Sequence, residues 1–280
     1  MLMFDLLEEQ LAGPAQHYAK LARNHLELKK MLEIPKSSKD WRIAVLHSLE
    51  GGHALGGNIE WLDEFARRGV VLITLTHFFN KGIASAPNAY PFFPDSNSPW
   101  PLQGLTDFGR EVIKKMEAIG MLIDVTHTTS TALADILAVT TNPVVATHSS
   151  VRTLGDHAYS FFDEHIQEIA RRGGLIGVIL FPHLLSNYTS ERTEHEYGSL
   201  GDVVRTIRYI AKICGTHKHV AIGSDFEGFI SAPKEMKCLG KIDYLRQLLL
   251  KEFDYDQNVV EDIMANNTIE FILKNWRSGV

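Results

Sequence analysis

Cysteine is scarce in this sequence. Only two of the 280 residues are cysteines, Cys214 and Cys238, and they lie far apart in the chain. They form neither the Cys-x-x-Cys pair of many metal sites nor the spacing of a disulfide framework. We therefore expect a fold without disulfide bridges in a reducing compartment, for which the cytoplasm is the default.

The sequence also lacks a surplus of positive charge and a long apolar run. It has 28 Lys and Arg against 34 Asp and Glu, a formal net charge of -6, so a nucleic-acid partner is not expected. No window approaches the roughly 20 apolar residues that cross a bilayer. The acidic N-terminus does not have the pattern of a signal peptide. Taking Met1 as the start, we expect no membrane partner and no export.

What the sequence does contain is typical of a globular protein. Hydrophobic residues make up 45% and charged residues 22%, which is enough for a large core. No internal repeat or shift in composition marks a second domain. We expect a single domain over 1–280, with a helical segment and linker over 1–40, β/α units over 42–228 and C-terminal helices over 241–277.

Short apolar runs alternate with helical patterns along the chain. The runs are almost continuously apolar, as in parallel strands covered by helices, and this alternation predicts a parallel α/β fold. A Pro-, Asn- and Ser-rich stretch over 81–104 is expected to be a loop over the strand ends. The predicted strands are 42–47, 70–76, 121–126, 143–147, 174–180 and 219–224, and the predicted helices between and after them are 58–68, 106–119, 130–139, 163–172, 201–214, 241–252 and 257–277.

Histidines and carboxylates follow nearly every predicted strand. Since the carboxyl ends of parallel strands meet at one edge of the fold, we expect these side chains to converge. The residues in question are Glu50 with His47 and His53, then His77, His127, His148 and Asp225.

Imidazole and carboxylate together suit zinc, and a catalytic zinc needs about three protein ligands and a water. Glu50, His127 and His148 could supply such a set. A bound zinc activates water and polarises a carbonyl group, so hydrolysis is the predicted reaction class. His47 stays unassigned, and His53 is expected to support Glu50 without binding the metal.

The strand-end segments resemble, in order, successive motifs of the membrane (renal) dipeptidase family. The resemblance runs from about residue 42 to the end of the chain and implies a TIM-barrel-like (β/α)8 fold and metal-dependent hydrolysis of dipeptides. The segments are LHSLEGGHAL (46–55), LITLTH (72–77), LTDFGREVIKKMEAIGMLIDVTH (105–127), ATHSS (146–150), GGLIGVILFP (173–182) and VAIGSDFEGF (220–229).

The resemblance also implies a role for each matching residue. Glu50 would bridge two metals, and His127 and His148 would complete the shell of the second metal. Asp225 would sit at the first metal and transfer protons. His77 would stabilise the oxyanion of the tetrahedral intermediate.

The sequence departs from the family at three places. The family's first strand ends in a His-x-Asp pair that holds the first metal, and this chain contains no His-x-Asp. About two strands of the eight are therefore expected to be absent, with one zinc bound and the second site impaired. Tyr159 stands where the family has an arginine that binds the substrate carboxylate, so Tyr159 becomes the substrate contact; Arg152 is nearby in sequence. Glu227 is one methylene longer than the usual Asp.

Three readings remain open. The chain could be an active metallo-dipeptidase acting on small dipeptide-like substrates, a catalytically silent homologue that keeps the fold and at most one metal, or a shortened form of a longer active protein. With six strands, the sheet should be open between 42–47 and 219–224. The opening could be covered by the 1–40 helix, filled by a partner chain, or left as an open, wet groove beside the metal site. We expect homo-oligomerisation to shield part of it.

Overall fold

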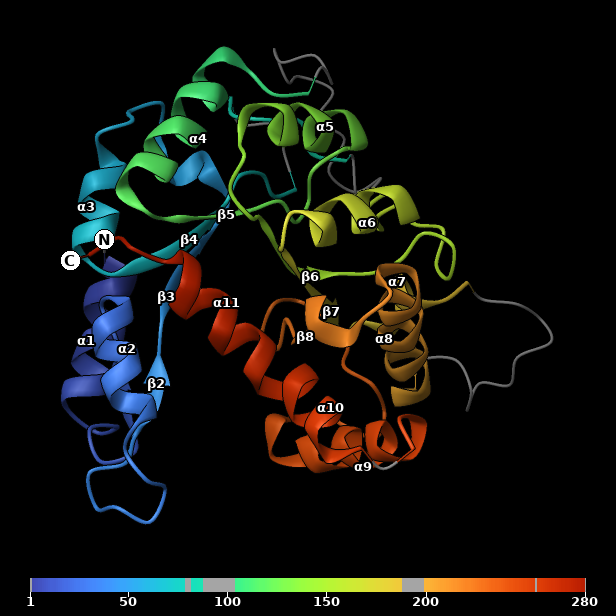
Figure 1. Ribbon diagram of the computed structural model, residues 1–280. Helices are drawn as coiled ribbons and strands as arrows, with labels where there is room; N and C mark the ends of the chain where they lie inside the picture. The colour runs from blue at the N-terminus through green and yellow to red at the C-terminus, as the bar shows by residue number, and fades with distance from the viewer. Residues whose placement is uncertain (1, 79–81, 88–103, 188–198, 255, 280) are drawn as a thin grey trace.

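The fold is built on a parallel six-stranded sheet. A computed structural model describes residues 2–78, 82–87, 104–187, 199–254 and 256–279 (Figure 1). The strands of the sheet lie in sequence order, β3-β4-β5-β6-β7-β8, and all neighbours are parallel. Their bounds are β3 His47–Glu50, β4 Val70–Thr74, β5 Leu122–Asp124, β6 Val145–Ser149, β7 Leu175–Ile179 and β8 Val220–Gly223. The predicted α/β class is confirmed.

Helices connect successive strands, as the sequence pattern predicts. The five main connecting helices are α3 Trp61–Arg67, α4 Asp107–Ile119, α5 Ser130–Val139, α6 Asp163–Arg171 and α8 Leu200–Cys214. Local signals set their ends: the Thr106 side chain accepts the Gly109 N–H at the start of α4, and Gly120 ends the helix in the left-handed conformation. The short helix α7, Pro182–Leu185, was not predicted.

The two faces of the sheet pack against different parts of the chain. The outer face contributes Ile73, Ile123, Val125, Ile176 and Val178 to the main core, which also contains buried residues of α3, α4, α5, α6 and α8. These side chains alternate along each strand with those of the opposite, inner face. The near-continuous apolar character of the strands therefore reflects burial on both faces.

The C-terminal helix covers part of the inner face. Helix α11, Asn267–Asn275, runs across the sheet in Figure 1, and Phe271 and Trp276 belong to a second core. Helix α2, His25–Leu32, adds Leu28 and Met31 to the same core. The sheet residues of this core that alternate with the outer set are Leu122, Val145, Leu175 and Ala221. This half of the inner face is thus an apolar interface.

The remaining C-terminal elements agree with the expected helices over 241–277. They are α9 Ile242–Glu252 and α10 Gln257–Glu261, followed by a π-helical turn, Asp262–Asn266, that leads into α11. No helix in the described ranges combines the length and apolar character needed to cross a bilayer.

The expectation that residues 1–40 are only helix and linker is wrong. After α1, Leu2–Ala12, the chain forms β1, Ala19–Leu21, which pairs in parallel with β2, Ile43–Val45. The predicted strand 42–47 is therefore two strands, β2 and β3, in two different sheets. Strand β1 has only three residues and lies close to helical segments in the chain. Its apolar pattern is therefore too short to be recognised in the sequence.

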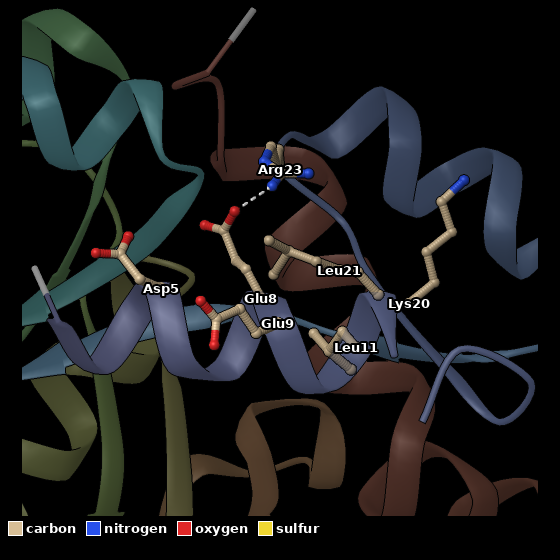
Figure 2. A pocket seen from close by; sticks show the side chains of 8 residues that line it. Asp5, Glu8, Glu9, Leu11, Lys20, Leu21 and Arg23 are labelled. Atoms are coloured by element: carbon tan, nitrogen blue, oxygen red, sulfur yellow. Dashed lines mark hydrogen bonds and ion pairs between the residues drawn. The ribbon is translucent and has the colours of Figure 1, made fainter. Parts of the chain in front are cut away.

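Helix α1 packs beside β1 and contacts Arg23, after β1, and His47, at the start of β3, through polar and aromatic groups. Glu8 binds Arg23 at 2.6 Å, and Figure 2 shows this pair beside a hollow of about 510 Å³. His47 is buried here, with its ring 4.6 Å from that of Phe4, and burial lowers its pKa. His47 is thus a packing residue of the N-terminal segment.

The six-stranded sheet has two open edges within the described ranges. β3 pairs only with β4, and β8 only with β7, as expected from the sequence. The predicted strand 42–47 was expected to be unpaired on one side. This is wrong for residues 43–45, which pair with β1. Of the stretch 81–104, only 82–87 and 104 lie within the described residues.

The apolar half of the inner face makes a testable contribution to stability. Trp276 is fully buried, and its indole N–H donates to the Ser278 hydroxyl at 2.6 Å. Trp276→Ala should therefore lower the free energy of unfolding by about 3–5 kcal/mol, measured by denaturant titration. Tyr244→Ala is the control, because Tyr244 is 54% exposed and its loss should cost less than about 0.5 kcal/mol. Equal effects would show that α11 is not a structural part of the sheet core.

Candidate metal centre and active site

The predicted strand-end residues converge at the carboxyl edge of the sheet. Glu50 ends β3, His148 lies in β6, and His77, His127 and Asp225 follow β4, β5 and β8. Because the strands are parallel and adjacent, residues more than 150 positions apart in sequence approach one another. The alignment of these positions with strand ends was visible in the sequence.

Three of these residues form a compact donor group. Glu50 Oε1 lies 3.1 Å from His127 Nε2 and 3.1 Å from His148 Nε2, and the two Nε2 atoms are 3.0 Å apart. Ligands at about 2.0–2.1 Å from a tetrahedral zinc are separated by roughly 3.3 Å, so the three donors fit one ion. Among the described residues, this is the one group of three such donors within 4.8 Å of one another.

His77 lies beside this group without joining it. Its Nε2 is 3.5 Å from Glu50 Oε1, and its ring centroid is 4.9 Å from that of His127. Burial lowers the pKa of His77 to about 4, and the neighbouring His127 and His148 add to the effect, although the charge of Glu50 opposes it. His77 is therefore a neutral imidazole near pH 7 and can donate one hydrogen bond.

Asp225 lines the same cavity as Glu50 and His148 but is not part of the compact group. The cavity has a volume of about 250 Å³ and lies between the open edges, with Ser48 of β3 and Gly223 of β8 also in its lining. Burial raises the pKa of Asp225, against the opposing effect of His148. Its backbone φ of 54° is in the left-handed region, where strain is typical of functional positions.

Hydrogen bonding controls the charge of the donor group. Burial alone would raise the pKa of Glu50, but hydrogen bonds from His127 and His148 hold it well below its usual range. Burial likewise opposes the charged form of His148, yet its hydrogen bond to Glu50 and the charge of Asp124 raise its pKa. Glu50 is thus an ionised candidate ligand over the whole physiological range.

Asp124 binds the residues that directly precede His127 and His148. It was not identified from the sequence. It is fully buried in β5 and accepts hydrogen bonds from the hydroxyls of Thr74, Thr126 and Thr147 at 2.6, 2.7 and 2.7 Å. It also accepts the backbone N–H groups of Thr126 and Thr147 at 2.9 and 3.1 Å. The available signal was a lone acid inside the apolar run MLIDVT, because buried charges require dedicated partners.

A bulge in β6 directs His148 into the site. The pairing register of β6 with β7 shifts between Ala146 and Ser149. The Thr147 carbonyl then comes so close to its neighbours that a Cβ on Gly177 would lie 2.0 Å from it, and one on Gly223 1.9 Å. These two glycines are therefore needed for the close approach of β6 that carries Thr147 and His148.

Tyr159 lies against the donor group as part of an aromatic wall. Its ring is 5.1 Å from that of His127, Phe78 is 6.3 Å away, and its hydroxyl donates to the Pro87 carbonyl at 3.3 Å. Arg152 is held by Asp156 at 2.8 Å and lies over the Phe162 ring at 4.7 Å. Arg152 thus binds a carboxylate of its own segment.

His53 packs against the turn that follows Glu50. The His53 ring lies over Gly51, where a Cβ would be 2.2 Å from His53 Cε1. The larger hollow beside α1 is lined by none of the strand-end candidates, whereas Glu50, His148 and Asp225 line the smaller cavity at the carboxyl edge.

The fold and this site define a class: parallel α/β proteins of the barrel-like type that carry a candidate metal centre at the carboxyl ends of their strands. The chain belongs to the membrane dipeptidase family (peptidase family M19), which it matches over residues 7–275.

Two curated relatives illustrate the similarity. An uncharacterized dipeptidase of Schizosaccharomyces pombe is 28% identical over 236 residues, 84% of this chain and 53% of that protein. Dipeptidase aclJ of Aspergillus oryzae is 31% identical over 211 residues, 75% of this chain and 46% of that protein. The chain thus spans about half the length of these relatives.

Solved structures share the fold. The probable dipeptidase PvdM from Pseudomonas aeruginosa has a TM-score of 0.84 at 21% identity, covering 97% of this chain and 78% of that chain. A metallo peptidase from Rhodobacter sphaeroides, liganded with a phosphinate mimic of the dipeptide L-Ala-D-Ala, has a TM-score of 0.78 at 20% identity, covering 97% and 72%. The barrel-like architecture inferred from the sequence agrees with both.

The glycine at the end of β8 gives a test of the site geometry. A Cβ on Gly223 would clash with backbone atoms of Thr147, so Gly223→Ala should displace the segment that carries His148. We expect zinc affinity to fall by about tenfold or more, measured by competition with a chelating dye. Gly240→Ala is the matched control, because its nearest atom would be Cys238 Sγ at 3.8 Å. Unchanged zinc affinity in Gly223→Ala would contradict this account of the bulge.

Proposed function

We propose that this chain is a metal-dependent hydrolase of dipeptides or related small amides. The observation that carries the proposal is the convergence of Glu50 Oε1, His127 Nε2 and His148 Nε2 within 3.1 Å of one another at the carboxyl edge of a parallel sheet. Its membership of a dipeptidase family supports the same reaction class.

The metal of this proposal is one zinc ion, held by Glu50, His127 and His148. Bound zinc would supply Lewis acidity toward a carbonyl group and activation of water. For a second ion, Glu50 and Asp225 are the carboxylates that line the cavity among the residues that the structure describes, and we propose that this second position is impaired.

Asp225 is proposed to accept and return the proton of the attacking water. It lines the cavity with Glu50 and His148, and burial raises its pKa toward the range in which a general base works best. Because Asp225 is outside the compact donor group, its proposed role is proton transfer.

His77 is proposed to stabilise the oxyanion that forms during attack. A neutral imidazole keeps one N–H donor, and His77 lies 3.5 Å from Glu50 at the edge of the donor group. A donor aimed at developing negative charge lowers the barrier by about 3 kcal/mol.

Tyr159 is proposed to contact the substrate through its ring. Its hydroxyl binds the Pro87 carbonyl, so the aromatic face, together with Phe78, forms the surface beside His127. Such a surface favours an apolar group of a dipeptide-like molecule, because an unpaired carboxylate is costly to bury there.

The cellular setting is proposed from the remaining features. Both Cys214 and Cys238 are free thiols, which agrees with a reducing, cytoplasmic environment. The open edges of β3 and β8 favour a homo-oligomer in which a second copy covers part of the opening.

The metal content can be measured directly. Protein purified without chelator and supplied with zinc is expected to hold one ion per chain, because three donors fit one tetrahedral ion. His148→Ala should lose it, whereas the exposed His17→Ala should keep it. Elemental analysis is the measurement, and either two tightly held ions or none would contradict the single-site proposal.

The proposed roles of Asp225 and His77 can be tested by measuring kcat and KM of variants on a panel of dipeptides. Asp225→Asn should lower kcat by about 100-fold or more, because it removes a proton acceptor with little change of shape. His77→Ala should lower kcat by about 100-fold with a smaller change in KM, because its donor acts mainly in the transition state.

The matched controls are Asp243→Asn and His17→Ala, which change exposed residues and should leave kcat unaltered. If Asp225→Asn retains wild-type kcat, Asp225 has no part in the mechanism. Full metal occupancy without turnover in the wild type would instead favour a catalytically silent homologue.

A further inference from the structure

The backbone beside each of the two candidate histidine ligands is bound by the same carboxylate. His127 directly follows Thr126, and His148 directly follows Thr147. Each threonine donates both its backbone N–H and its hydroxyl to the buried carboxylate of Asp124. One side chain therefore fixes the backbone at the base of both ligands.

The hydrogen bonds can be assigned by counting protons. Thr147 has a single hydroxyl hydrogen, and its oxygen is 2.7 Å from Asp124 Oδ2. The Asp124 carboxylate accepts from three hydroxyls and two backbone N–H groups, so the Thr147 hydroxyl hydrogen is donated to it. The Thr126 hydroxyl hydrogen is used in the same way, toward Asp124 Oδ1 at 2.7 Å.

This assignment determines the tautomer of His148. Thr147 Oγ1 is 3.0 Å from His148 Nδ1 and has no hydrogen left to donate. Nδ1 must then carry the hydrogen and donate to Thr147. In the charged ring Nε2 also carries a hydrogen, which it donates to Glu50 Oε1 at 3.1 Å. In the neutral ring Nδ1 keeps its hydrogen, and Nε2 is left with its lone pair, directed at the point shared with Glu50 Oε1 and His127 Nε2.

We propose that Asp124 is a positioning residue that, through Thr147, fixes His148 in the tautomer with Nε2 free to bind a metal. The metal-binding role of His148 rests on the proposed function. Its tautomer rests on hydrogen-bond geometry alone. It extends the site to a carboxylate that would touch neither metal nor substrate. Groups of this kind commonly change metal affinity by about 10- to 100-fold.

The test replaces the hydroxyl of Thr147 with a methyl group of the same shape. Thr147→Val removes the acceptor for His148 Nδ1, whereas Thr147→Ser keeps it. Thr74→Val is the matched control, because the Thr74 hydroxyl also donates to Asp124 and is buried, but its hydrogen bond to Asp124 does not involve a histidine.

Two measurements are made on each protein. Nitrogen-15 NMR of the imidazole rings in metal-free protein at alkaline pH reads the tautomer, with His148 assigned through His148→Gln. Zinc affinity is measured by competition with a chelating dye. Neither measurement depends on hydrolysis of a substrate.

In the wild type and Thr147→Ser we expect the hydrogen on Nδ1. Thr147→Val should lose this preference and bind zinc about 10- to 100-fold more weakly, while Thr74→Val should stay within about 3-fold of the wild type. A wild-type His148 that carries its hydrogen on Nε2 would overturn the proposal. So would equal effects of Thr147→Val and Thr74→Val. Absence of zinc binding in the wild type would instead refute the metal centre, with the NMR result still deciding the tautomer.

Discussion

The arrangement of the carboxyl edge depends on one buried charge, the carboxylate of Asp124. Hydrogen bonds to a charged group stabilise by about 1.5–3 kcal/mol each, whereas an unpaired buried charge is strongly destabilising. The chain satisfies Asp124 with donors from three consecutive strands, because Thr74 belongs to β4, Thr126 follows β5 and Thr147 lies in β6. The need to satisfy this one group therefore sets how these strands meet, and with them the segments that carry His127 and His148.

The inner face of the sheet is divided into an apolar half and a polar half. Two residues further along each strand, Leu122 is followed by Asp124 and Val145 by Thr147, so the same face changes character within one pleat repeat. Helix α11 covers the apolar half through Phe271, and Trp276, directly after the helix, belongs to the same core. The polar half stays accessible as the cavity that contains Glu50 and Asp225. The division separates the part of the face that stabilises the fold from the part that can bind a ligand.

Much of the fold could be predicted because it follows from local patterns. The helix over 107–119 has clear apolar periodicity, and both it and the helix over 130–139 begin after a capping threonine, Thr106 or Thr129, so their bounds agree closely with expectation. The strand β1 could not be predicted, because a three-residue strand has too few side chains to show a period. The division of 42–47 into β2 and β3 depends on which strands lie beside each half.

The sequence by itself determined the class of fold and the chemical types at the site, because strand ends and metal-binding side chains can both be recognised locally. The three candidate donors Glu50, His127 and His148 were identifiable on that basis. Only the tertiary structure decided which groups meet: that Asp225 lines the cavity outside the compact donor group, that Arg152 is bound by Asp156, and that Asp124 supports both histidines. Contacts of this kind join strands far apart in the chain, and their distances follow from sheet register and from a bulge in β6, which no local pattern encodes.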